Sequence, residues 1–231
     1  MRRSETDRII DEGREACSRN GFHLPPFARW SPQEALAQPD ALRLMAEGGL
    51  GWAIAEFQPG RFPTHGLTVF TLRMGAPALV GRASGKLYGE KVLVARDGQV
   101  TPLHYHAVKT EDIVNRGGGR FVVELLAVDA HGRPKDEPVD AIKDVAVIRV
   151  PPRGRVVLEP GESLQLDPFV AHAFWAEGGT VVAGEVSLVN DDATDNLFIL
   201  PLPAAAAIEE DAPARHLLAR DVPALIRKAA A

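Results

Sequence analysis

Cysteine is almost absent from this chain of 231 residues, in which Cys17 stands alone. A single cysteine excludes a disulfide within the chain, and it agrees with a reducing compartment such as the cytoplasm. Cys17 lies on the apolar side of a predicted helix. We therefore expect a buried structural thiol rather than a nucleophile.

The chain also lacks clusters of basic residues and long apolar runs. Its net charge of -5, with no Lys/Arg cluster, argues against nucleic acid as a partner. The apolar runs fall short of the roughly 18 residues that cross a bilayer, and the charged start, Met1 to Asp11, holds no apolar signal core. We expect a cytoplasmic protein without a membrane partner. Its length allows one large domain, or at most two small ones, with a real core.

Helix signals lie at the two ends of the chain. The first fifty residues predict three helices: one starts at Ser4 and stops at Asn20-Gly21, and one starts with a capping box at Ser31. Pro39 breaks the second helix, and Asp40 is expected to cap a separate short one that ends at Gly48-Gly49. The tail predicts a helix over residues 214–220 and another after Pro223. These segments are expected to flank the body of the protein.

The middle of the chain reads as short strands separated by turns. Alternating or β-branched runs predict ten strands: 52–57, 67–73, 88–96, 99–106, 120–128, 145–150, 155–158, 163–167, 171–176 and 180–189. Such a pattern favours an all-β sandwich or barrel. Asp97-Gly98 is a two-residue hairpin signal, which predicts that strand 99–106 runs back along strand 88–96. We expect one domain, 1–231, with a helical extension 1–50, a barrel 51–200 and a tail 201–231.

Four residues in this body have the spacing of ligands for one metal ion. His104 and His106 are two apart in a predicted strand, so both imidazoles project from one face. Glu111 joins them only if the chain turns near residues 107 and 108, and His172 starts a later strand. Nitrogen and oxygen ligands of this kind suit Mn, Fe, Co, Ni or Zn rather than a soft thiolate site.

The same residues carry a family resemblance. The spacings H-x-H-x4-E-x6-G, which ends at Gly118, and G-x6-P-x3-H, which ends at His172, resemble the two motifs of the cupin superfamily. The resemblance implies a jelly-roll β-barrel that holds a metal with three histidines and one glutamate. The second motif departs from the pattern, because Val170 stands where a glycine is usual and the histidine follows Pro168 by four residues instead of five.

Longer polar strings, 90–119 and 184–198, are similar to the core of the D-lyxose isomerase family of cupin sugar isomerases. This resemblance implies a metal-dependent aldose-ketose isomerase that interconverts D-lyxose and D-xylulose, and also D-mannose and D-fructose, through a metal-stabilised enediolate. The metal implied is Mn2+, with Co2+, Fe2+, Ni2+ or Zn2+ as alternatives. The implied partners are a monosaccharide substrate and a second copy of the chain in a homodimer.

Such chemistry needs a base that moves a proton between two neighbouring carbons. Glu185 is the first candidate, because a lone acid facing inward from the apolar strand 180–189 is costly without a task or a partner. The alternative is an outward glutamate on a strand whose inward face is formed by Val182, Gly184, Val186 and Leu188. Strand parity alone does not choose between them.

Three further residues are candidates for catalysis or for substrate binding. Lys109 lies between two ligands, where it either protonates or hydrogen-bonds a sugar oxygen or neutralises Glu111 or Asp112. Asp195 either acts on the sugar, as a second acid-base group or hydroxyl ligand, or holds a turn. Of Phe174 and Trp175, which flank His172, one should pack in the core and the other should line the pocket as a platform for sugar C–H groups; we choose Trp175 for the pocket.

Two other functions remain compatible with the metal motif. A cupin dioxygenase would use the same ligands to hold Fe(II), but it would need an apolar pocket and not the polar run 190–196. A non-catalytic sugar-binding or storage cupin would need no intact ligand set. The prediction is therefore an isomerase.

Overall fold

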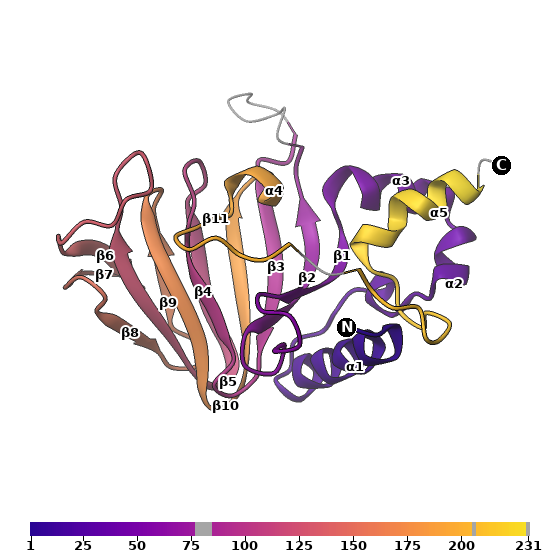
Figure 1. The fold of residues 1–231 in the computed structure, drawn as a ribbon, viewed down its shortest axis with the longest axis horizontal. Helices are drawn as coiled ribbons and strands as arrows, with labels where there is room; N and C mark the ends of the chain where they lie inside the picture. The colour runs from indigo at the N-terminus through magenta and orange to yellow at the C-terminus, as the bar shows by residue number, and fades with distance from the viewer. Residues whose placement is uncertain (77–84, 205–206, 230–231) are drawn as a thin grey trace.

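A computed structural model describes residues 1–76, 85–204 and 207–229. Its strands form a large curved antiparallel sheet (Figure 1). The helices from the two ends of the chain gather beside β1 (Gly51–Glu56) and β2 (Gly66–Met74), while β6 (Val139–Lys143), β7 (Ala146–Val150) and β8 (Arg155–Leu158) lie at the opposite end of the molecule. The predicted all-β class is confirmed. None of the described helices is long and apolar enough to cross a membrane.

The chain begins with helices and then turns to strands. The N-terminal elements are α1 (Arg3–Arg19), η1 (Pro26–Arg29), α2 (Pro32–Leu36) and α3 (Pro39–Gly48). The strands are β1 (Gly51–Glu56), β2 (Gly66–Met74), β3 (Tyr88–Ala95), β4 (Val100–Tyr105), β5 (Glu111–Ala127), β6 (Val139–Lys143), β7 (Ala146–Val150), β8 (Arg155–Leu158), β9 (Ser163–Leu166), β10 (Val170–Leu188) and β11 (Leu197–Phe198). The short α4 (Asp192–Asp195) precedes β11, and η3 (Ala219–Asp221) and α5 (Val222–Ala229) end the described chain.

The barrel has two sheet layers, and the long strands β5 and β10 run through both of them. They pair with each other along nearly their whole length, with register shifts near Glu177 and Val182. One half of this pair is flanked by β3 and β9, and the other half by β4 and β8. The apolar core lies between the layers and includes Leu93, Ala183, Phe121 and Phe174.

The bend of this pair depends on glycine. Gly118 has a φ of 98°, and a Cβ added there would lie 2.0 Å from the carbonyl oxygen of Thr180 on β10. A side chain therefore fits neither the backbone conformation nor the space. The bend also explains why the sequence predicts residues 171–176 and 180–189 as two strands, since Gly178 and Gly179 between them resemble a turn.

The sequence predicts that the strands on either side of Asp97-Gly98 pair with each other, and this prediction is wrong. The turn itself forms, because the amide of Gln99 donates to the carbonyl oxygen of Arg96 at 2.9 Å. However, β3 and β4 do not pair with each other; β3 pairs with the second half of β10, and β4 with its first half. A two-residue turn fixes a local reversal, whereas pairing across both halves of β10 is set by distant residues.

The N-terminal helix covers the outer face of the sheet. Ile10, Ala16 and Cys17 of α1 pack with Trp52 and Phe70 of the first two strands. Cys17 is buried as expected, and burial raises the pKa of its thiol to about 11. The capping box predicted at Ser31 is also present at the start of α2.

The tail returns to α1 instead of forming the first helix predicted for it. The backbone amides of Arg215 and His216 donate to the carboxylate of Asp7, and the Nε2 atom of His216 lies 2.8 Å from Asp11. The amide of Leu217 donates to the carbonyl oxygen of Trp30 at 3.2 Å, and residues 214–218 are not helical, so the predicted helix 214–220 is wrong. The helix predicted after Pro223 is confirmed as α5.

Candidate active site

Three buried histidines converge inside the barrel. His104 and His106 come from β4 and the turn after it, and His172 lies directly opposite His104 in the β4–β10 register. One ring nitrogen from each lies within 4.8 Å of the others, so this group could hold a metal ion. The structure thus brings together the three histidines that the spacing predicted.

Backbone carbonyls fix the orientation of all three rings. The Nδ1 atoms of His104, His106 and His172 lie 2.8, 2.6 and 3.1 Å from the carbonyl oxygens of Pro102, Asp195 and Val170. A carbonyl only accepts, so each Nδ1 carries the proton and each Nε2 keeps its lone pair for a ligand role. Burial, together with the nearby His172 and His106, lowers the pKa of His104 well below its usual range, which keeps its ring neutral.

Glu111 completes the group at the start of β5. Its Oε1 lies 3.1 Å from Nε2 of His172 and 3.6 Å from Nε2 of His106. The chain turns between β4 and β5, as the fourth ligand requires. Nε2 of His172 is buried and has no hydrogen-bond partner in the described residues. Three imidazole nitrogens and one carboxylate oxygen fit a divalent ion of the Mn-to-Zn series.

A cavity of about 120 Å³ opens beside these residues. One wall is apolar and includes Phe57, Leu67, Phe174 and Phe198, while the other carries the charged and polar groups Lys91, Lys109, Glu111, Glu185, Asp192 and Asn196. Because a water molecule occupies about 30 Å³ of liquid, the cavity suits a small molecule rather than a polymer.

Glu185 faces the cavity. Val181 and Ala183, which share its strand parity, lie in the core between the layers, whereas Val186 and Leu188 are exposed on the outer face. The alternative of an outward Glu185 therefore does not describe this structure. Only 8% of the Glu185 side chain is exposed, and its Oε1 accepts from Lys109 at 2.8 Å and from Lys91 at 3.2 Å.

Lys109 bridges a predicted metal ligand and the predicted base. Its Nζ lies 2.7 Å from Oε2 of Glu111 and 2.8 Å from Oε1 of Glu185. Burial alone would lower the pKa of Lys109, but the charges of the two glutamates outweigh it and raise the pKa above its usual value. The ammonium group is thus held charged at the wall of the cavity.

Lys91 is a cavity residue that the sequence reasoning does not single out. It lies directly opposite Glu185 on β3 and is buried, with Nζ 2.7 Å from Oδ2 of Asp192 on α4. Burial alone would lower its pKa, yet the charge of Glu185 and that of Asp192 raise it overall. The sequence feature that could have identified Lys91 is its position directly before the apolar run 92–95.

Asp195 holds the turn between β4 and β5. Its carboxylate accepts from the backbone amides of Ala107, Val108 and Lys109 at 2.8, 3.1 and 3.2 Å. Its own carbonyl oxygen accepts from His106. The side chain is buried and is not among the residues that line the cavity in the described chain. These contacts match the turn-holding alternative for Asp195.

Trp175 lies on the other face of β10 from His172 and Phe174. Its indole N–H donates to Glu177 at 2.9 Å, and the guanidinium group of Arg155 lies 5.0 Å from its ring centroid. The structure therefore does not bring Trp175 to the cavity. Phe174 takes the aromatic place there, because it shares the parity of His172.

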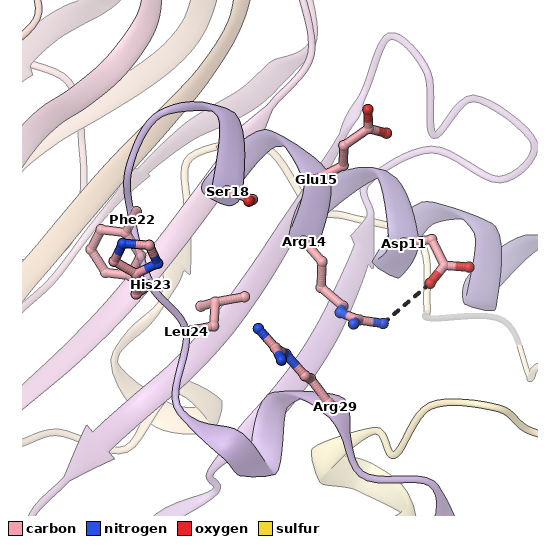
Figure 2. A pocket seen from close by; sticks show the side chains of 8 residues that line it. All are labelled: Asp11, Arg14, Glu15, Ser18, Phe22, His23, Leu24 and Arg29. Carbon is pink, nitrogen blue, oxygen red and sulfur yellow. Dashed lines mark hydrogen bonds and ion pairs between the residues drawn. The ribbon is translucent and has the colours of Figure 1, made fainter.

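A second hollow lies between α1 and the segment that follows it (Figure 2). Arg14 and Arg29 both point into it, and Arg14 contacts Asp11 at 3.4 Å. Its lining in the described chain includes none of the predicted ligands or acid-base residues. The chemistry suggested by the sequence therefore lies at the first cavity.

A jelly-roll sheet that gathers three histidines and a glutamate inside defines a cupin-type barrel. The chain matches the D-lyxose isomerase family model over residues 1–222. It is 41% identical to the D-lyxose/D-mannose isomerase of Escherichia coli O157:H7 over 224 residues, which cover 96% of this chain and 98% of that protein. The Serratia proteamaculans protein of the same name is 40% identical over 226 residues, covering 96% and 97%. The chain therefore belongs to the D-lyxose isomerase family and is an aldose-ketose isomerase.

Solved structures show the same fold in more distant proteins. The L-ribose isomerase of Cellulomonas parahominis aligns with a TM-score of 0.59 and 15% identity, over 91% of this chain and 98% of that one. The L-ribose isomerase of Acinetobacter sp. DL28, in complex with L-ribose, aligns with a TM-score of 0.56 and 16% identity, over 87% and 93%. The predicted cupin-type jelly roll is thus confirmed.

Proposed function

We propose that this chain interconverts D-lyxose and D-xylulose, and also D-mannose and D-fructose, in the cavity beside the histidines. One observation carries the proposal: Glu185 lies in the same cavity as the predicted ligands and is bridged to Glu111 by Lys109. The family relatives, named for lyxose and mannose, support the choice of sugars.

The residues that would hold the metal are His104, His106, Glu111 and His172. Mn2+ is the ion we propose, because the resemblance to the D-lyxose isomerase family implies it; the ligand set by itself suits any ion of the Mn-to-Zn series. When bound there, the ion would act as a Lewis acid that polarises the sugar oxygens at C1 and C2. The chain's own contribution is to present four ligand atoms already oriented by backbone carbonyls.

Glu185 is proposed as the base. Its carboxylate takes the proton from C2 of the aldose, and the electron pair left behind forms the C1–C2 double bond of an enediolate as the carbonyl oxygen at C1 gains negative charge. The proton on Glu185 exchanges with water before Glu185 delivers a proton to C1, while the hydroxyl proton of O2 passes to O1, so that the carbonyl forms at C2. One carboxylate can serve both carbons because they are neighbours.

Lys109 and the aromatic wall prepare the cavity for this transfer. Lys109 keeps Glu185 and Glu111 in place and offers an N–H donor to a sugar oxygen. Phe174 and Phe198 supply apolar surface against which sugar C–H groups can pack. Removal of water from such a wall strengthens the interactions between charges.

We also propose that the protein acts in the cytoplasm as a homodimer. Its lone cysteine is buried and free, which suits a reducing compartment. The last strand in the sheet order is β7, and the exposed Val145 and Val147 lie at its start. An apolar strand edge of this kind favours cover by a second copy.

The proposed base is tested by Glu185→Gln. In D2O, the wild type should exchange the C2 proton of D-lyxose with solvent during turnover. In Glu185→Gln the rate of this exchange should fall at least about a hundredfold, while the protein keeps its metal. Proton NMR measures the exchange, and elemental analysis measures the metal. Glu177→Gln, half-exposed on the same strand, serves as the control. Undiminished exchange in Glu185→Gln would remove Glu185 as the base.

A further inference from the structure

A bulge in β4 turns Thr101 toward the metal-ligand side of the barrel. In an unbroken strand Thr101 and His104, three residues apart, would point to opposite faces. The β4–β10 register pairs His104 with His172 and Thr101 with Phe174, so Ala173 alone opposes two residues of β4. Thr101 therefore joins His104 and Phe174 at the cavity wall.

The bulge contains Pro102, which cannot donate to a sheet ladder and fits this position. Its carbonyl oxygen accepts from Nδ1 of His104 at 2.8 Å. The same irregularity thus fixes the imidazole of His104 and redirects Thr101. Sequence reasoning, which treats 99–106 as one regular strand, has no means of placing Thr101 beside the histidines.

The hydroxyl group of Thr101 is buried without a partner. Five buried side-chain atoms lack a hydrogen bond in the described residues: Thr101 Oγ1, His172 Nε2, Ser187 Oγ, Asn190 Oδ1 and His216 Nδ1. Thr101 is the one of these five residues that lines the cavity. An unpaired buried hydroxyl costs stability, and valine would have the same shape without that cost. Rotation about its Cα–Cβ bond lets the hydroxyl turn to a bound ligand.

We propose that Thr101 binds a hydroxyl group of the sugar and so helps to select polyhydroxylated substrates. The proposal rests on the proposed function of the cavity and adds a residue to it. A sugar hydroxyl both donates and accepts, so it can pair with the threonine hydroxyl whichever way the proton points. Thr101 is thus a substrate-binding residue, separate from the proton transfer.

The test compares Thr101→Val and Thr101→Ser in the metal-loaded protein. Thr101→Val should lower kcat/KM for D-lyxose about tenfold, mainly through KM, because one hydrogen bond to substrate is lost. Thr101→Ser keeps the hydroxyl and should stay within about threefold of the wild type. Ser187→Ala removes another unpartnered hydroxyl, away from the cavity lining, and should leave the kinetics unchanged. Wild-type kinetics in Thr101→Val would overturn the proposal.

Thermal unfolding supplies a second readout that needs no activity. Thr101→Val should have a Tm equal to or above that of the wild type, because an unpaired polar group is removed from a buried site. A lowered Tm would instead assign the hydroxyl a structural role and overturn the proposal. If the wild type converts no aldose, the proposed function fails by itself. Titration calorimetry with D-lyxose then still tests Thr101: weaker binding by Thr101→Val supports its role, and equal binding contradicts it.

Discussion

The charged side chains at the cavity nearly balance one another. Lys91 and Lys109 face Glu111, Glu185 and Asp192, which leaves one net negative charge beside the histidines. Buried charges are retained only when they are paired, and here each ammonium group contacts two carboxylates. A divalent cation would reverse the sign of this net charge. The cluster is therefore suited to a bound cation and to the negative charge that develops on a sugar.

Lys91 should influence the pH dependence of catalysis. Replacing it with methionine removes a buried positive charge that contacts Glu185 and Asp192. Burial alone would raise the pKa of Asp192, but the charge of Lys91 holds it below its usual value, so Asp192 should bind a proton more readily in the variant. We expect Lys91→Met to lower kcat/KM about tenfold or more and to move the acidic limb of its pH profile to higher pH. Lys135→Met, which removes an exposed lysine, is the matched control. An acidic limb at the wild-type pH in Lys91→Met would show that the charge of Lys91 does not set the pH dependence through Asp192.

Among single residues, the sequence predicts the metal ligands better than it predicts the other residues of the cavity. His104, His106 and Glu111 lie close along the chain, so strand parity and one turn bring them together. Glu185 is different, because the direction of its side chain depends on which face of β10 turns inward. Lys91 and Thr101 depend on a cross-strand partner and on a bulge, respectively, and neither can be seen in the spacing of residues.

Among the elements, the short helix α4 contacts both the predicted metal ligands and the charged wall of the cavity. It follows β10 and places Asp195 over the turn that separates the histidines from Glu111. The carbonyl oxygen of Asp195 also orients the ring of His106. Asp192, at the other end of α4, contacts Lys91. One turn of helix thus supports both the predicted ligand set and the lysine beside the predicted base.

Asp195→Asn should therefore weaken metal binding more than catalysis. An amide has one acceptor oxygen where the carboxylate has two, so part of the turn loses its support. We expect the affinity for Mn2+ to fall about ten- to a hundredfold, with kcat near the wild-type value at saturating metal. Metal titration and kinetics at each metal concentration measure the two effects, and Asp136→Asn in an exposed loop is the control. Unchanged affinity with a lowered kcat would instead favour the acid-base role predicted for Asp195.

Capping and turn residues predict where a helix or a turn forms, but they do not predict which distant segment it pairs with. The capping box at Ser31 and the helix after Pro223 depend on neighbours in the chain, and both are present. The turn at Asp97-Gly98 also forms, but the strands that it connects pair with different halves of β10. In the tail, the path of residues 215–217 is set by contacts with Asp7 of α1 and with the carbonyl oxygen of Trp30, both about two hundred residues away in sequence.

Across the whole molecule, the two ends of the chain meet on the outer face of the barrel. The side chain of Arg3 binds Glu210 and Asp221, and the backbone amide of Arg3 donates to the carbonyl oxygen of Glu209. The apolar face of α1 packs on the strands whose other face lines the cavity. We propose that helices, barrel and tail form one domain, since the tail docks on α1 and α1 docks on the sheet.

We propose that this barrel is a metal-dependent sugar isomerase. Its most direct test is to strip the metal with a chelator, add back Mn2+, and follow ketose formation from D-lyxose and D-mannose. We predict that activity is lost on stripping and restored with one equivalent of Mn2+ bound per chain. Full activity in the stripped protein, or no turnover of any aldose with the metal demonstrably bound, would contradict it.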